Sequence, residues 1–377
     1  MEKIRVLHCL ETVGSGGVEQ LRYNLAKYLD RDRFEQKIIC THAIGALPAK
    51  ISAEGVEVIP VGTMRSPFHI DRYRAALKTA RSFRPHIIHG AVFEGISLAA
   101  VTGKLSGVPV IVIEETSDPV DRRWKGNLLM RVYASLSDKV VAESEAAGAY
   151  VRSVVKVREP KLQVINNAAD YPDYPDASST ARLKAALEIM PGDFIVGSVG
   201  RLFDEHKKFS DLIKAAALLR DSCPRLKLLI IGEGADKDAL SALCADLHIQ
   251  DRVIFTGYQG NTAPYYACMD VFALASQKEA FGIVLVEAML FRLPVVATAV
   301  GGIPYVVRNG ETGILVDKNA PHALADAIAA FYDNPEKRRA FGMAGFQRAE
   351  AEFTASAYTK RIADMYIDLV QKKGVDI

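Results

Sequence analysis

The sequence predicts an α/β protein built from two doubly wound halves. Apolar, strand-like runs alternate with amphipathic helical patterns along the whole chain, which is typical of parallel sheets covered by helices on both faces. The length of 377 residues exceeds what one hydrophobic core usually accommodates. A linker-like segment near the middle divides the pattern into two similar parts.

The first half carries seven strand-like runs, with helical patterns in the longer intervals between them. The predicted strands are Ile4–Leu10, Phe34–Cys40, Val56–Val61, His86–His89, Val110–Ile113, Lys139–Ala142 and Leu162–Ile165. The predicted helices are Val18–Leu29, Arg72–Phe83, Gly95–Leu105 and Ala146–Val155. The segment AADYPDYPDASST after Asn167 is rich in Pro, Asp and Ser, which favours a linker.

The same pattern restarts after this linker. The predicted strands are Phe194–Val199, Leu226–Ile231, Val253–Phe255, Val271–Leu274, Pro294–Thr298 and Gly313–Val316. The predicted helices are Asp211–Arg220, Asp238–Ala245, Phe281–Phe291 and Ala320–Phe331, and a last one, Ala355–Val370, follows the second half. We therefore predict domains over 1–170 and 178–354, with a cleft between the carboxyl ends of their sheets.

The composition is that of an ordinary globular enzyme, with 49% hydrophobic and 24% charged residues. A formal net charge of +2 argues against a dedicated nucleic-acid binder. The five cysteines are odd in number and lack metal-ligand spacing, which favours a reducing, cytoplasmic compartment. We expect neither a signal peptide nor a membrane span, because no apolar run is long enough.

The strongest motif is a pair of glutamates in the second half. Glu279 and Glu287 are separated by seven residues, with Phe281 and Gly282 between them and an apolar run from Ile283 on. This pattern predicts a loop and then a helix, whose first-turn amides form a ready site for a phosphate. Because the two carboxylates can accept from hydroxyl groups on either side, a nucleotide-sugar is the ligand that fits. A solvated helix face gives the same spacing, but a carboxylate in so apolar a run is rarely buried without a partner.

Glycine turns follow several other predicted strands. Gly16 and Gly17 lie between the first strand and the first helix, where glycine lets the backbone approach a diphosphate closely. Three turns in the second half end neighbouring strands at Gly200, Gly232 and Gly257. Each position is also compatible with an ordinary strand-end turn.

Basic residues follow the first strand of the second half. Arg201 and either Lys207 or Lys208 can pair with the two phosphates of a departing nucleoside diphosphate. The glutamate motif is not accompanied by an Asp-x-Asp pair that would bind a divalent cation, so protein cations must offset the charge on that leaving group. Alternatively, these basic residues lie on a solvated loop and bind no ligand. This alternative suits Lys208 better than Arg201, which directly follows the buried strand.

These motifs together resemble the sugar-donor signature of the retaining family 4 glycosyltransferases, which have the GT-B fold. The family pattern is Glu, seven residues and Glu, followed by a Pro-led strand and a Gly-Gly-x-Pro-Glu turn. This chain has Gly301, Gly302 and Pro304, and then Tyr305 in place of the last Glu. The resemblance covers nearly the whole chain. It implies two Rossmann-like domains facing each other across a cleft, with 355–377 returning to the first.

The resemblance also implies an activity. The chain would be a metal-independent hexosyltransferase with no cofactor, using a nucleoside-diphosphate-sugar as co-substrate, with a UDP-sugar favoured. The acceptor would be a glycan, a lipid-linked molecule or a small molecule in cell-surface polysaccharide or glycoconjugate biosynthesis. Glu279 would contact the transferred sugar and Glu287 the ribose. The predicted catalytic residues are Arg201, Lys207, Glu279 and Glu115. The predicted residues that bind the sugar donor are Gly16, Gly17, Gly200, Gly232, Gly257, Phe281, Gly282, Ile283, Val284 and Glu287.

Two departures from the family pattern leave rival interpretations open. Glu115 aligns with a His that touches the transferred sugar in many members, and Tyr305 replaces a Glu. A non-catalytic nucleotide-sugar binding partner of a transferase fits these departures. Among enzymes, the rival is another nucleotide-sugar enzyme of the same fold, such as an epimerase or a phosphorylase. His89 is equally compatible with a structural role and with a ligand role. A nicotinamide dehydrogenase is disfavoured, because the sequence lacks the dinucleotide-binding pattern Gly-x-Gly-x-x-Gly followed by an acidic residue about 20 positions on.

Two basic runs in the first domain cover 65–84 and 122–131. Residues 1–170 carry 24 Lys and Arg against 19 Asp and Glu, whereas the remainder carries 23 against 26. An anionic membrane surface or an anionic acceptor would complement these runs, and a solvated basic face is the alternative. We therefore expect a cytoplasmic protein with peripheral contact at the inner face of the membrane.

Overall fold

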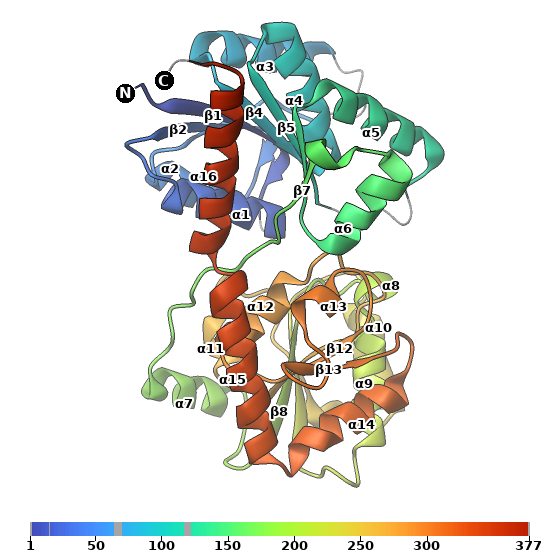
Figure 1. Ribbon diagram of the computed structural model, residues 1–377. Coiled ribbons are helices and arrows are strands. Elements are labelled where there is room, and N and C mark those ends of the chain that lie inside the picture. Colours follow the sequence, from blue (N-terminus) through green and yellow to red (C-terminus); the bar gives the residue numbers. More distant parts are fainter. Residues whose placement is uncertain (1, 15, 64–69, 117–121, 376–377) are drawn as a thin grey trace. The chain divides into compact units, whose positions relative to one another are not determined.

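The computed structural model describes residues 2–14, 16–63, 70–116 and 122–375, and the chain divides into two compact units (Figure 1). The first unit comprises Met1–Ala168 and Ala355–Ile377, and the second comprises Ala169–Thr354. The sequence predicts a first domain over 1–170 that is joined by 355–377, and a second domain that starts at 178. The structure begins the second unit nine residues before 178.

The first unit contains a parallel sheet in the order β3-β2-β1-β4-β5-β6-β7. Its strands are β1 (Ile4–Val13), β2 (Phe34–Ala43), β3 (Glu57–Pro60), β4 (Ile87–Ala91), β5 (Val110–Glu115), β6 (Lys139–Ala142) and β7 (Leu162–Val164). Its helices are α1 (Gly17–Tyr28), α2 (Leu47–Ala53), α3 (Ile70–Phe83), α4 (Val92–Ser106), α5 (Trp124–Leu136), α6 (Glu145–Tyr150) and α16 (Ala355–Lys372). A π-helical turn, Val151–Val155, follows α6.

Side chains alternate between the two faces of this first sheet, as a doubly wound fold requires. Ile4 and Val6 of β1 pack with α1 and α16 in one core. Leu7 and Cys9 of the same strand pack with α3 and α4 in another. Helix α16 therefore covers one face of the first sheet together with α1 (Figure 1).

The second unit contains a parallel sheet in the order β10-β9-β8-β11-β12-β13. Its strands are β8 (Phe194–Val199), β9 (Leu226–Ile231), β10 (Val253–Phe255), β11 (Val271–Leu274), β12 (Val295–Thr298) and β13 (Gly313–Val316). Its helices are α7 (Ala177–Ala186), α8 (Asp204–Lys207), α9 (Phe209–Leu218), α10 (Lys237–Asp246), α11 (Ala263–Tyr266), α12 (Ile283–Leu290), α13 (Ile303–Val306), α14 (Pro321–Tyr332) and α15 (Pro335–Glu352).

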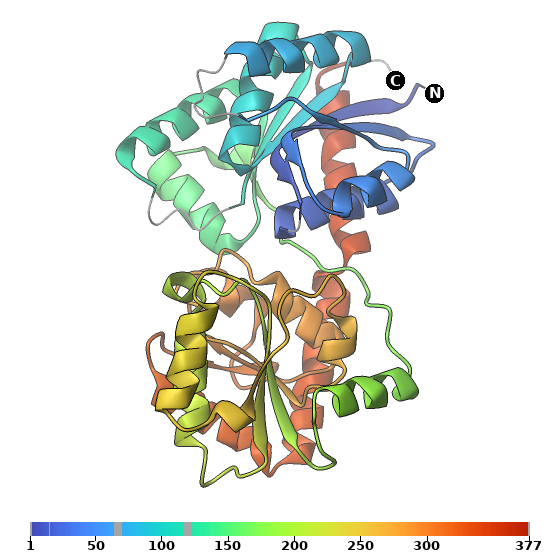
Figure 2. The same ribbon diagram turned by 180° about the vertical axis from the view of Figure 1, so that it is seen from behind.

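Two cores flank this second sheet. Helices α9, α10 and α14 enclose one of them, and α11, α12, α13 and α15 enclose the other (Figures 1 and 2). The predicted α/β class and its two doubly wound sheets are thus confirmed. The strand order reverses between β1 and β4 in the first sheet and between β8 and β11 in the second. Open α/β sheets bind ligands at such a reversal, beyond the carboxyl ends of the strands.

The predicted linker differs from the structure in its second part. Asp176 caps α7 by accepting from the Ser179 amide, so the last residues of the expected linker are helical. Tyr174 donates to the Leu290 carbonyl at 2.8 Å and packs edge-on against Phe291. The segment from 169 on is therefore docked onto the second unit. Within the described ranges, no helix combines the length and apolar character that a bilayer span requires.

Candidate sugar-donor site

Three glycine turns meet at the carboxyl ends of β8, β9 and β10. The Gly232 amide donates to the Gly257 carbonyl at 3.0 Å, and Gly232 has φ of +142°. A Cβ at Gly232 would lie 1.9 Å from the Gly200 carbonyl oxygen, so no side chain fits there. The structure thus brings these three predicted positions together in one edge of the second unit.

Arg201 and Lys207 lie in the loop after β8, close to these turns. The Arg201 side chain is exposed and makes no hydrogen bond or ion pair with a described residue. Lys207 ends the short helix α8, and Lys208 adopts left-handed φ of +49° before α9. The two adjacent lysines therefore belong to different parts of the loop.

Lys207 forms an ion pair with Glu279, the first glutamate of the motif. The Lys207 ammonium lies 2.5 Å from Glu279 Oε2, and both side chains are mostly buried. The Ser276 hydroxyl donates to the same oxygen at 3.2 Å. The Gln277 amide donates to the His206 carbonyl at 2.8 Å, which fixes the glutamate loop beside α8. The structure pairs Glu279 with Lys207, which distinguishes that lysine from Lys208.

The helix after this loop starts where the sequence predicts. Gly282 caps α12 with φ of +93°, a conformation that a residue with a Cβ rarely adopts. Phe281 is buried and packs edge-on against Phe353. Ile283 and Val284 form the first turn of α12, whose amides have no partner within the helix. This helix end offers partial positive charge close to Lys207.

The Gly301–Gly302 turn packs directly on the backbone of the glutamate loop. The Gly302 amide donates to the Glu279 carbonyl at 2.9 Å. A Cβ at Gly301 would lie 1.9 Å from that same carbonyl oxygen. Glu279 is therefore held through its backbone by this turn and through its carboxylate by Lys207.

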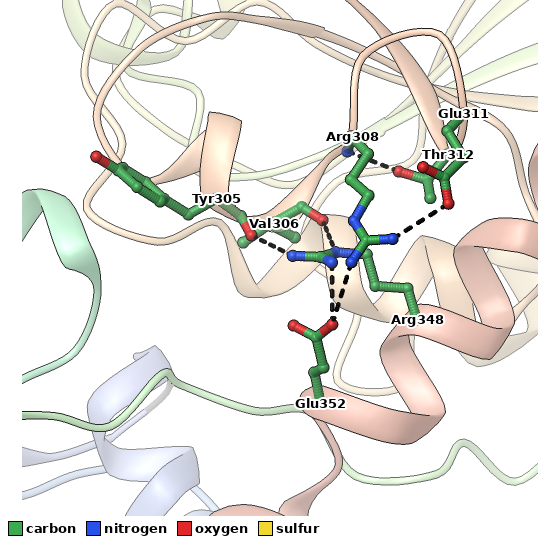
Figure 3. Close-up of polar contacts among 7 residues, drawn as sticks. All are labelled: Tyr305, Val306, Arg308, Glu311, Thr312, Arg348 and Glu352. Carbon is green, nitrogen blue, oxygen red and sulfur yellow. Dashed lines mark hydrogen bonds and ion pairs between the residues drawn. The ribbon is translucent and has the colours of Figure 1, made fainter.

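Arg348 of α15 holds the other end of α13, the helix that follows this turn. Its guanidinium donates to the carbonyls of Tyr305 at 2.7 Å and Val306 at 2.9 Å, as Figure 3 shows. It also donates to Glu352 at 2.9 Å, and Arg308 lies 3.8 Å from the same carboxylate oxygen. Tyr305, which replaces the family's Glu, thus contributes its backbone to this network, while the residue as a whole is 45% exposed.

Glu287 lies one turn inside α12, and its partner is Tyr266 of α11. The Tyr266 hydroxyl donates to Glu287 Oε2 at 2.7 Å. Burial raises the pKa of Glu287, and the hydrogen bond from Tyr266 opposes that rise. The role of Tyr266 cannot be predicted from the sequence, because no pattern links a tyrosine 21 residues away to the glutamate.

Gly16 and Gly17 lie in the first unit, at the start of α1. Gly16 caps the helix with an extended conformation, and Gly17 is its first residue. Strand β1 extends to Val13, three residues beyond the predicted end, so the glycine loop is shorter than expected. Ser15 of this loop lies outside the described residues.

Glu115 ends β5 of the first unit and is paired with Arg122. The guanidinium binds both carboxylate oxygens, with Nη2 at 3.0 Å from Oε1. Arg122 also lies over the rings of Phe93 and Tyr150. A sugar hydroxyl would have to compete with this ion pair for Glu115.

His89 lies in a fully buried polar cluster of the first unit. Its Nδ1 lies 2.6 Å from the Tyr366 hydroxyl of α16, and its Nε2 lies 3.3 Å from Glu114. Arg22 of α1 forms an ion pair with the same glutamate. Burial lowers the pKa of His89, which favours the neutral ring. These contacts give His89 a structural role in holding α16.

Among the described residues, no group of three or more His, Cys, Asp or Glu side chains could hold a metal ion. The five cysteines are free and buried. The groups that converge in the second unit are instead an exposed guanidinium, an ammonium, a helix N-terminus and two carboxylates. Such a set suits a dianionic diphosphate with hydroxyl-bearing groups on both sides.

Two family signatures match most of the chain. The one described as "Glycosyltransferase Family 4" matches residues 15–171, and "Glycosyl transferases group 1" matches residues 179–348. The chain belongs to the family 4 glycosyltransferases, a family of enzymes with the GT-B fold.

Named relatives agree with this assignment. N-acetyl-alpha-D-glucosaminyl L-malate synthase of Bacillus anthracis is 30% identical over 245 residues, which are 65% of this chain and 63% of that enzyme. Lipopolysaccharide core biosynthesis glycosyltransferase LpsE of Rhizobium meliloti is 34% identical over 190 residues, 50% of this chain and 53% of that protein. The matched region thus spans about half to two thirds of the length of these relatives.

A solved structure supports the fold. HepE of Anabaena, crystallised with UDP, superposes with a TM-score of 0.83 at 23% identity, covering 97% of this chain and 100% of that one. At this identity the likeness shows a shared GT-B architecture.

Proposed function

We propose that the protein is a retaining glycosyltransferase that takes its sugar from a nucleoside-diphosphate-sugar, with a UDP-sugar favoured. The observation that carries the proposal is the Lys207–Glu279 pair beside the N-terminus of α12. A cation and a helix end suit a diphosphate, and a carboxylate next to them suits a sugar hydroxyl. The UDP bound by HepE supports the choice of base.

Each predicted site residue has one proposed task. Arg201 and Lys207 stabilise the charge that builds on the leaving diphosphate, so the reaction needs no metal or other cofactor. The backbone from Phe281 to Val284 holds the phosphates, and Glu279 contacts the transferred sugar. Glu287 holds the ribose. The turns at Gly200, Gly232 and Gly257 flank the nucleoside, Gly16 and Gly17 approach the phosphates from the first unit, and Glu115 contacts the sugar.

The retaining outcome rests on the family resemblance, and no covalent nucleophile is assigned. The proposed acceptor is a glycan, a lipid-linked molecule or a small molecule. Two of these acceptor classes are suggested by the names of the relatives above. The Bacillus anthracis enzyme is named for L-malate, a small molecule, and LpsE is named for lipopolysaccharide core biosynthesis. A role in cell-surface polysaccharide or glycoconjugate biosynthesis in the cytoplasm is part of the same proposal.

Helix α5 supports a further part of the proposal, contact with an anionic membrane. Three apolar side chains spaced four residues apart are exposed along it, namely Trp124 (70%), Leu128 (52%) and Val132 (46%). The exposed cations on and beside this helix are Arg123, Lys125 and Arg131, and α5 contains no acid. An apolar stripe with cationic flanks suits the surface of an anionic bilayer.

The structure shows which described residues of the two basic runs are exposed. Met130, which lies within the 122–131 run, is fully buried in the core of the first unit, so it is not part of the exposed stripe. In the 65–84 run, α3 exposes Arg74, Lys78 and Arg81. Arg65 lies outside the described residues.

Flotation with liposomes tests the membrane contact. The wild type should float with phosphatidylglycerol liposomes at low salt and less at raised salt, because exposed charges are screened. Trp124→Ala should weaken flotation, whereas Met343→Ala, at an exposed apolar position of the second unit, should not. Flotation that is indifferent to lipid charge would remove the electrostatic part of the proposal.

A thermal-shift panel tests the sugar-donor site. A nucleotide that binds only the native state raises the melting temperature, so UDP and UDP-sugars should raise it more than GDP, ADP or their sugars. Lys207→Ala should reduce the shift. A panel in which no nucleoside diphosphate or its sugar raises the melting temperature would contradict the proposal.

A further inference from the structure

The partner of Glu287 has a position that is set independently of Glu287. Tyr266 is 1% exposed, and its ring stacks on Phe291 with centroids 5.4 Å apart and an interplanar angle of 16°. The ring of Phe272 lies 5.7 Å away on β11. Since these contacts immobilise the ring, the hydroxyl is already in place before any ligand binds.

The hydrogen bond from Tyr266 engages only one oxygen of the glutamate. The hydroxyl lies 2.7 Å from Oε2, whereas Oε1 makes no hydrogen bond with a described residue. The Glu287 side chain also keeps part of its surface accessible. A carboxylate with one oxygen fixed and the other open is oriented to accept from a ligand hydroxyl.

We propose that Tyr266 is a positioning residue for the sugar donor, holding Glu287 Oε2 so that Oε1 accepts from a ribose hydroxyl. This inference rests on the proposed function, in which Glu287 contacts the ribose. Tyr266 itself touches no substrate. It acts by fixing the rotamer of Glu287 and by keeping its carboxylate ionised.

The surroundings of Glu287 explain why ionisation depends on this hydroxyl. Burial raises the pKa of Glu287, and the Tyr266 hydrogen bond lowers it. Helix α15 packs Gly345 against Met289 of α12, and β11 and β12 contribute apolar side chains to the same core. Among the described residues, Tyr266 is the only one whose side chain forms a hydrogen bond with the Glu287 carboxylate.

The direction of the pH effect follows from these contacts. The ionised carboxylate accepts from the ribose hydroxyl, so nucleotide affinity is present above the pKa of Glu287 and is lost as the pH falls through it. Removing the Tyr266 hydroxyl leaves burial unopposed and raises that pKa. The acid limb of nucleotide binding should therefore move to higher pH.

Calorimetry on the full chain with UDP, 2′-deoxy-UDP and 3′-deoxy-UDP tests the inference. Tyr266→Phe should weaken UDP binding about tenfold or more, the scale of a hydrogen bond to a charged group. One of the two deoxy analogues lacks the hydroxyl that Glu287 contacts. Tyr266→Phe should weaken binding of that analogue by less than about threefold, because the contact is already absent. The acid midpoint for UDP should rise. Tyr265→Phe is the matched control and should change none of these values, since its hydroxyl has no described partner.

Glu287→Gln provides a second variant in case Tyr266→Phe does not fold. It should abolish the acid limb and reduce the discrimination between UDP and the deoxy analogues. Equal losses for UDP and both analogues, or an unmoved acid midpoint, would overturn the role of Tyr266 while leaving the proposed function intact. A wild type that binds none of UDP, GDP and ADP would overturn the proposed function and this inference with it.

Discussion

Lys207 and Glu279 are the two side chains on which the proposed chemistry depends. The sequence leaves Lys207 and Lys208 as alternatives, because both follow the same strand. The structure separates them through backbone conformation, since Lys208 takes a left-handed φ and Lys207 reaches Glu279 at 2.5 Å. Glu279 thus holds the Lys207 ammonium at the edge where the diphosphate is proposed to bind.

Replacing Lys207 should impair turnover strongly. Lys207→Ala should lower the turnover number roughly 10²–10³-fold, the scale observed when one preorganised electrostatic group is lost. Lys208→Ala is the neighbouring control and should have a small effect. Glu115→Gln should lower the turnover number less than Lys207→Ala does. Glu115 is proposed to contact the sugar and not to stabilise charge on the leaving group. Steady-state release of nucleoside diphosphate measures all three variants, and a silent Lys207→Ala would refute the assignment.

Some residues of the site cannot be found from the sequence. The Glu279–Glu287 spacing and the glycine turns are local signals, since each is tied to a loop or helix end that the chain specifies by itself. Tyr266 and Arg122 are different, because each acts only through a partner that tertiary packing brings to it. Their roles follow from contacts rather than from spacing.

Helix α13 connects the sugar-donor loop to α15. Its first end follows the glycine turn on Glu279, and its last carbonyls are held by Arg348 (Figure 3). A four-residue helix cannot maintain itself through internal hydrogen bonds alone. Arg348 therefore stabilises the position of the turn that supports Glu279.

Loss of Arg348 should affect both stability and binding of the sugar donor. Arg348→Ala leaves two carbonyls without their donor and should lower the free energy of unfolding by about 1–3 kcal/mol. It should also raise KM for the sugar donor. Arg308→Ala is the matched control, because Arg308 contacts the same Glu352 but is more than half exposed, so its effect should stay below about 1 kcal/mol. Denaturant titration and KM measurements compare the two, and equal effects would contradict this account.

Strands were easier to predict than helices. Six observed strands, among them Lys139–Ala142 and Leu226–Ile231, have the predicted bounds, because buried parallel strands appear as short apolar runs. Helix α15 was not predicted. It packs through small residues rather than an apolar stripe, and a Cβ at Gly342 would lie 1.9 Å from the Arg292 carbonyl oxygen. Close backbone packing of this kind leaves no hydrophobic period in the sequence.

The chain is organised so that its last helix stabilises its first domain. Helix α16 contributes Tyr358 and Tyr366 to the buried cluster around Arg22 and Glu114. Burial opposes ionisation of Glu114, but Arg22 and His89 outweigh it and lower its pKa to about 2. The cluster is therefore charged at neutral pH and depends on both ends of the sequence.

Breaking this cluster should destabilise the first unit. Glu114→Gln leaves Arg22 buried without its counter-charge, which costs about 3–5 kcal/mol in other proteins. Because the folded pKa is depressed, the contribution is present above the ordinary value near 4.5 and is lost as the pH falls through about 2. Chemical denaturation across this pH range measures it. Glu57→Gln, at an exposed pair with Lys37, is the control and should leave stability nearly unchanged.

The proposed activity is transfer of a sugar from a nucleoside-diphosphate-sugar without a metal. The most direct measurement is release of nucleoside diphosphate in the presence of excess chelator, with the anomeric configuration of the product determined by NMR. UDP-sugars, supplied with glycan, lipid-linked and small-molecule acceptors, should give acceptor-dependent UDP release, an unchanged rate with chelator and a product of retained configuration. A protein that binds the sugar donor but releases no nucleoside diphosphate would be a binding partner or an epimerase. That result, or loss of turnover with chelator, would contradict the account.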